Sequence, residues 1–199
     1  VRGWLLVALP ALFSAIGFFH TLFLEQQMSR MVVLAFTFVG TTLFVEHAFR
    51  FVHLPAYYQP FAIASLTRVL TVVAIFELTA TLFGLRLFLH VPMSVLGICF
   101  ALITWVLLAS VLSAAQIERR VLWRWTALGT LLLTELFVAL LFLPTGFYTN
   151  ASFLTLGYYV WIGLSRAQTS GTLSIALRQR YALMWLVATA LVVMTARWV

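Results

Sequence analysis

The stretch TRVLTVVAIFELTATLFGLRLFL, from Thr67 to Leu89, is a long apolar run that carries three charged residues. Arg68 lies near its start, Glu77 in its middle and Arg86 near its end. The run is longer than the about 20 apolar residues that a helix needs to cross the hydrocarbon of a bilayer. It therefore predicts a transmembrane helix with a carboxyl group inside it.

The composition of the chain extends this prediction to the whole protein. Its 199 residues are 64% hydrophobic and 9% charged, whereas a soluble domain carries roughly 25% charged residues. Because so few charges cannot cover a globular surface, most of the surface must face lipid. We expect a single transmembrane helical domain over residues 1–199, integral to the cytoplasmic membrane of a prokaryote.

Seven apolar segments are separated by polar or proline-marked linkers, at residues 3–24, 31–51, 61–87, 92–115, 121–143, 147–164 and 181–198. Segments that are apolar on every face form helices in lipid, because unpaired backbone groups are costly there. The sequence predicts an all-α bundle of six to eight spans, with seven favoured. The linker at 165–180 alternates apolar and polar residues, and is either a helix lying on the membrane surface or a loop.

Arginine, which is the sole source of the net charge of +7, is distributed unevenly between the two sides of the predicted bundle. With the N-terminus in the cytoplasm, the inner side holds Arg2, Arg50, Arg68, Arg119, Arg120, Arg124, Arg166, Arg178 and Arg180. The outer side holds Arg30, Arg86 and Arg197. Cytoplasmic loops are enriched in basic residues, so we predict a cytoplasmic N-terminus.

Glu77 is the residue that points most directly to function. A charged side chain in the middle of a span is costly unless it is paired or hydrated. Ala74, Ala80 and Gly84 share its helix face, and small residues let helices pack closely. We therefore expect Glu77 to point into the bundle. It either locks two helices together through hydrogen bonds or forms a proton or cation site.

Glu135 lies at a similar predicted depth in the fifth apolar segment. If the two helices touch, Glu77 and Glu135 can share a proton, and Thr134 can add a hydroxyl group. The alternative is that the two glutamates face different neighbours. Arg68 is nine residues from Glu77 and half a turn away around the helix, near the membrane edge. The candidate proton, ion or solute site comprises Glu77, Glu135, Arg68 and Thr134.

Two further sets of residues have a simple chemical interpretation. Glu46 and Arg50 are four residues apart, in the order that favours an ion pair on a helix. His20 and His90 fall near the outer ends of their segments. Two histidines from two helices can ligate a b-type haem or, with Glu25, a metal ion. No other cofactor is predicted.

Several classes of protein are excluded or disfavoured. The chain has no lysine, so it cannot form a Schiff base with retinal or pyridoxal phosphate. It lacks a nucleophile elbow, a glycine-rich phosphate loop and an HExxH motif, so no enzymatic reaction is predicted. The arginines lie between apolar runs, which favours membrane topology over nucleic-acid binding.

Three hypotheses remain. The protein moves a proton, ion or small solute through the bundle, or it is a non-catalytic subunit of a larger membrane complex or homo-oligomer, or it is a haem-binding electron-transfer subunit. All three place it in a lipid bilayer. The first depends on Glu77 and Glu135, and the third on His20 and His90.

Overall fold

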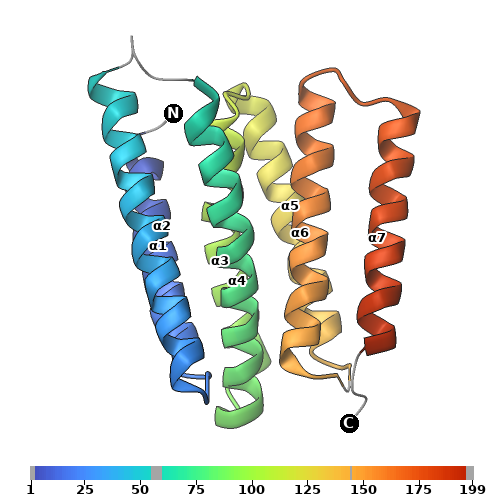
Figure 1. The fold of residues 1–199 in the computed structure, drawn as a ribbon. Coiled ribbons are helices and arrows are strands. Elements are labelled where there is room, and N and C mark those ends of the chain that lie inside the picture. Colours follow the sequence, from blue (N-terminus) through green and yellow to red (C-terminus); the bar gives the residue numbers. More distant parts are fainter. Residues whose placement is uncertain (1–2, 55–59, 144, 196–199) are drawn as a thin grey trace.

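A computed structural model describes residues 3–54, 60–143 and 145–195 of the chain. These residues form seven α-helices that run alternately up and down in one bundle (Figure 1). The helices are α1 (Gly3–Thr21), α2 (Gln27–His53), α3 (Pro60–Leu89), α4 (Met93–Ala114), α5 (Arg119–Leu140), α6 (Phe147–Thr169) and α7 (Ile175–Thr195). The predicted all-α bundle is confirmed, with one helix for each apolar segment.

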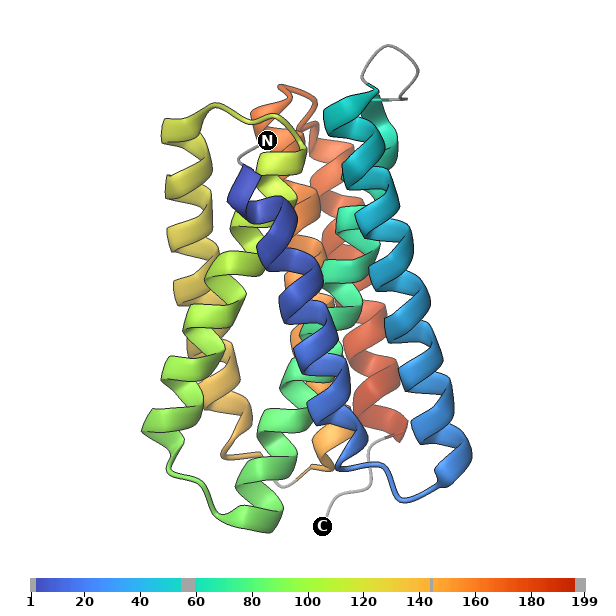
Figure 2. The ribbon, with the colours of Figure 1, turned by 90° about the vertical axis from the view of Figure 1, so that its left-hand side faces the viewer.

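Helix α3, which contains the stretch from Thr67 to Leu89, lies at the centre of the bundle. It contacts α1, α2, α4 and α6. Helix α5 packs on α4 and α6, and among the described helices α7 packs on α6 alone. The second view shows α1 and α2 beside α3 on one side and α4 and α5 on another (Figure 2). The stretch from Thr67 to Leu89 is therefore part of the central packing element of the bundle.

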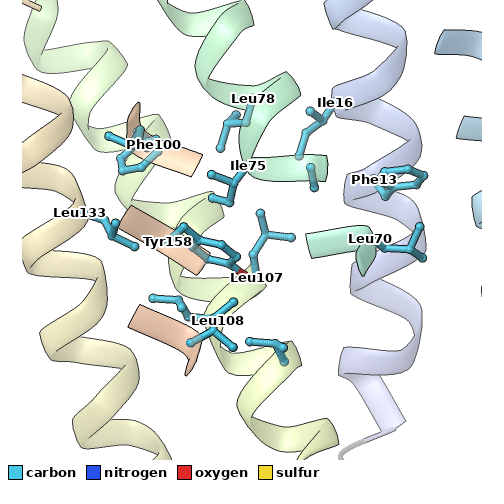
Figure 3. Packing of buried hydrophobic residues seen from close by; sticks show 14 of the residues in the cluster. Phe13, Ile16, Leu70, Ile75, Leu78, Phe100, Leu107, Leu108, Leu133 and Tyr158 are labelled. Atoms are coloured by element: carbon cyan, nitrogen blue, oxygen red, sulfur yellow. The ribbon is translucent and has the colours of Figure 1, made fainter. Parts of the chain in front are cut away.

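The core is built from large apolar side chains at the centre of these contacts. Tyr158 of α6 is fully buried and belongs to the same core cluster as Ile75 of α3 and Leu107 of α4 (Figure 3). The rings of Phe100 in α4 and Phe137 in α5 stack with centroids 4.6 Å apart and planes inclined by 6°. Such close packing holds membrane helices together, because the hydrophobic effect does not drive their association within lipid.

The outer surface of the bundle is apolar, as a lipid-facing surface requires. Phe18, Phe38, Leu102 and Leu131 are among the many large hydrophobic residues that stand exposed. By length and composition, the five helices α1 to α5 can cross a membrane. The protein is therefore an integral membrane protein, and membrane crossing by α6 and α7 stays a prediction.

The described arginines gather at one end of the bundle, which we call the arginine-rich end. It is formed by the C-termini of α2, α4 and α6 and the N-termini of α3, α5 and α7. Nearest this end lie Arg50, Arg68, Arg119, Arg120, Arg124, Arg166, Arg178 and Arg180. Arg30 and Arg86 lie nearer the opposite end, and the predictions for Arg2 and Arg197 fall outside the described residues. The positive-inside rule predicts that the arginine-rich end is cytoplasmic.

The linker predicted at 165–180 is much shorter in the structure. Helix α6 continues to Thr169 and α7 already begins at Ile175. Both predicted forms of this segment, a surface helix and a loop, are therefore wrong for most of its length. Polar residues such as Arg166 and Arg178 extend the two helices beyond their apolar segments, because arginine and glutamine are good helix formers.

The predicted ion pair on α2 is confirmed. The Arg50 guanidinium donates from Nη2 to Oε1 of Glu46 at 2.5 Å. Both side chains are exposed near the arginine-rich end, where such pairs add little stability.

Candidate functional site

Glu77 lies in the middle of α3 and points into the bundle, as its small-residue neighbours predicted. Its side chain is 4% exposed. Its Oε2 atom has no hydrogen-bond partner among the described residues. Thr81 donates its hydroxyl hydrogen to the backbone carbonyl of Glu77 at 2.7 Å, so this threonine does not serve the carboxyl group. Glu77 is thus a buried carboxyl with an unused oxygen.

The face of α3 that carries Glu77 is directed at α1 and α2. Leu70 and Gly84 lie seven residues on either side of Glu77 and share its face. A Cβ atom added to Gly40 of α2 would lie 3.0 Å from Leu70, and one added to Gly84 would lie 2.8 Å from Phe23, which follows α1. Gly84 is therefore required for the close approach of Phe23.

Among the described residues, two of the other polar atoms without hydrogen-bond partners lie on α1 and α2. They are Nδ1 of His20 in α1 and Oγ1 of Thr37 in α2. Both residues are buried, and α1, α2 and α3 contact one another pairwise. Buried polar groups in proteins are nearly always hydrogen-bonded. His20 and Thr37 thus add two unpartnered polar atoms to that of Glu77 on three touching helices, and further atoms of this kind lie on α3 to α7.

The structure does not bring Glu77 and Glu135 together. Helices α3 and α5 meet through the rings of Phe83 and Phe137, whose centroids are 5.0 Å apart. Glu135 precedes Phe137 by two residues, so it lies on the opposite side of α5. Its side chain is exposed on the outside of the bundle. The condition for a shared proton is therefore not met, and the alternative holds, in which the two glutamates face different neighbours.

Thr134 also lies apart from Glu77. Its hydroxyl donates to the backbone carbonyl of Thr130 at 2.7 Å, within α5. A threonine bonded in this way to its own helix has used its donor. Of the predicted four-residue site, the structure keeps Glu77 inside and separates Glu135 and Thr134 from it.

Arg68 is half-buried near the start of α3 and lines a cavity at the arginine-rich end together with Arg166. The sequence placed both arginines on one side of the membrane but gave no sign that they share a cavity. Their helices, α3 and α6, are distant in the chain and come together only through tertiary packing.

The two histidines predicted as haem or metal ligands lie in different surroundings. His20 is buried at the end of α1, with its ring 6.4 Å from that of Phe76 and 6.1 Å from that of Tyr148. His90 is exposed after α3, where its backbone has a φ of 53°. The described residues contain no cluster of three or more His, Cys or Glu side chains that can hold a metal ion. The haem hypothesis stays a prediction.

The protein is an all-α integral membrane helix bundle, with the carboxyl group of Glu77 buried inside it. Comparison with protein-family models, with curated proteins and with solved structures found no match to the chain. Its function is therefore inferred from the chemistry of its own residues.

Proposed function

We propose that the protein binds a proton or a small cation at Glu77 and moves it across the bilayer. The observation that carries this proposal is the buried Glu77 carboxyl, whose Oε2 has no partner among the described residues, in the middle of the central helix. A bare carboxylate in hydrocarbon is costly. A bound proton or cation removes this cost, and its release and rebinding constitute transport.

The unpartnered atoms of His20 and Thr37 support the same function. A proton or cation that leaves Glu77 needs further polar atoms along its path, and proton relays in membranes use acidic residues and histidine in this way. His20 on α1 lies towards the end of the bundle opposite the arginine-rich end. It is therefore the residue that we assign to the path between Glu77 and that side.

Replacing Glu77 by glutamine is expected to abolish proton or cation flux without unfolding the protein. Glutamine keeps the size of the side chain and its carbonyl oxygen, but it neither titrates nor carries a charge. The measurement is the decay of an imposed pH or sodium gradient in liposomes that contain the purified protein. The expected decay for Glu77→Gln equals that of protein-free liposomes.

The matched control is Glu46→Gln, which changes an exposed glutamate of α2 in the same way. It is expected to keep the wild-type flux. Flux by Glu77→Gln at the wild-type rate, for both protons and sodium, would rule out the proposed site.

A second candidate function, a subunit of a membrane assembly, is favoured by the exposed Glu135. It lies on an outward stripe of α5 at alternating spacings of four and three residues, which comprises Arg124, Leu128, Leu131, Glu135 and Val138. This spacing is that of a helix seam in a coiled coil. A carboxyl group exposed to lipid gains a hydrogen bond when another helix covers it.

Replacing Glu135 by leucine is expected to break this assembly, because leucine cannot form the hydrogen bond across the seam. Glu135→Gln keeps a donor and an acceptor and is expected to retain the assembly. The measurement is the mass of the protein purified in mild detergent. A wild-type protein that is a lone monomer under these conditions would contradict this candidate.

A further inference from the structure

A cavity of about 230 Å³ lies at the arginine-rich end and is lined by residues of α3, α6, the turn after α6, and α7. Its polar lining residues are Arg68, Tyr159, Arg166, Ser170, Thr172 and Tyr181. It is smaller than the about 300–1,000 Å³ typical of sites for drug-sized ligands. A cavity of this size and polarity suits a small polar group.

The charges around this cavity are unbalanced. Arg68 and Arg166 both line it, and no carboxylate of the described residues does. The five glutamates of the chain are elsewhere: Glu25 near the opposite end, Glu46 paired with Arg50, Glu77 and Glu135 within the bundle helices, and Glu118 in a neighbouring cavity. The chain has no aspartate. The two guanidinium groups therefore have no anionic side chain to neutralise them.

Arg68 also has an unmet hydrogen-bonding requirement. Its Nε atom is buried and has no partner among the described residues. A buried, unpartnered group of this kind is costly, and more so when it is charged. An anion in the cavity would satisfy the nitrogen and neutralise the charge together.

Helix α6 and its C-cap residue, Ser170, present one continuous face to this cavity. Tyr159, Gly163, Arg166 and Ser170 follow one another at spacings of four, three and four residues, so they lie on one side of the helix. A Cβ atom at Gly163 would overlap the hydroxyl group of Tyr181. The absence of a side chain at Gly163 thus lets α7 place the Tyr181 hydroxyl in the cavity wall.

We propose that this cavity binds a phosphate-type oxyanion, held by the guanidinium groups of Arg68 and Arg166 with the hydroxyls around them. The planar guanidinium has donors in the geometry that phosphate oxygens require. At about 1.5 Å per residue, Arg68 lies roughly 12 Å from the start of a helix about 45 Å long. A hydrocarbon core about 30 Å thick, centred on this helix, begins about 7–8 Å from the helix start. The backbone of Arg68 therefore lies about 4–5 Å inside the core, from where the long arginine side chain can extend to the headgroup layer.

The phosphate group can come from a lipid headgroup or from a free anion, and one experiment separates the two sources. The purified protein is heated in a neutral detergent at constant ionic strength, with sodium phosphate or with sodium chloride. In a second arm it is heated in phosphatidylcholine nanodiscs with and without phosphatidylglycerol. Binding to the native state raises the melting temperature. A response to inorganic phosphate assigns a free anion, and a response to phosphatidylglycerol alone assigns a lipid headgroup.

In either case Arg68→Gln and Arg166→Gln are each expected to weaken binding about tenfold, which is the usual loss for one charge-assisted hydrogen bond. Arg178→Gln is the matched control, because Arg178 is exposed on α7 and does not line the cavity. It is expected to respond as the wild type does. Arg68→Gln and Arg166→Gln each also remove one of two positive charges that line the same cavity. The melting temperature in the absence of ligand is therefore expected to stay unchanged or to rise.

Tyr181→Phe removes one hydroxyl donor and keeps the ring, so it tests the site if an arginine variant fails to fold. It is expected to weaken binding without lowering the melting temperature in chloride. Absence of a response to both phosphate and phosphatidylglycerol in the wild type would overturn the proposal. The proposal would also be overturned if the melting temperatures of Arg68→Gln, Arg166→Gln and Tyr181→Phe rose with ligand as much as that of the wild type.

Discussion

Replacing Phe137 by alanine is expected to lower the free energy of unfolding by about 2–3 kcal/mol. The Phe137 ring is fully buried between the rings of Phe100 and Phe83. Deleting it leaves a cavity of about 100 Å³, and each Å³ of residual cavity costs about 24 cal/mol. The lost packing contacts lie where side chains of α3, α4 and α5 meet.

The membrane setting reduces this loss below the value for a soluble core. In a soluble protein, Phe→Ala costs about 3–5 kcal/mol because the transfer of the ring from water adds to the cavity. In a bilayer the reference state is already surrounded by apolar chains, so the transfer contribution largely disappears. What remains is the loss of packing contacts.

Phe38→Ala is the control, since Phe38 on α2 is 72% exposed. Its ring faces lipid, so its removal leaves no cavity and is expected to change stability by less than about 0.5 kcal/mol. Unfolding by denaturing detergent, followed by the circular dichroism of the helices, measures both variants. Equal losses for Phe137→Ala and Phe38→Ala would contradict the division between a packed core at Phe137 and a lipid-facing surface at Phe38.

The helices were predictable because hydrocarbon leaves the backbone few alternatives. A run such as Thr67 to Leu89 must satisfy its own backbone groups, and a helix does so. The ends were less predictable, because apolar residues also occur in turns. Helix α1 ends at Thr21 and not at residue 24, since Leu22 and Phe23 form tight turns through hydrogen bonds to the carbonyls of Phe19 and His20.

The direction of each glutamate was predictable only where its neighbours differ in size. Around Glu77 the small residues Ala74, Ala80 and Gly84 mark one face of α3, and that face proved to be buried. Around Glu135 all faces of α5 carry Leu, Phe or Val. The local sequence therefore does not show which face is inward, and tertiary packing of Phe137 decides it.

The cavity of Arg68 and Arg166 was beyond prediction for a related reason. Each arginine alone is explained by a position near a membrane edge. Their shared cavity depends on the packing of α3 against α6 and on the approach of α7 at Gly163. These are contacts between distant parts of the chain, which periodicity and spacing do not determine.

Replacing Gly129 by alanine is expected to destabilise the protein by about 1–3 kcal/mol, the usual cost of overpacking. Gly129 lies on α5 against the indole ring of Trp161 in α6, and an added Cβ atom would overlap that ring. Trp161 cannot move freely, because its ring packs against that of Trp125 with centroids 5.3 Å apart. The methyl group must therefore push α5 and α6 apart.

Gly97→Ala tests whether this effect is due to packing and not to the loss of glycine itself. A Cβ atom at Gly97 of α4 would have no neighbouring atom of the described residues within 4 Å. Alanine is the better helix former by about 1 kcal/mol, so Gly97→Ala is expected to be neutral or stabilising. Unfolding by denaturing detergent compares the two variants. A Gly129→Ala protein as stable as Gly97→Ala would show that α5 and α6 do not approach each other through this glycine.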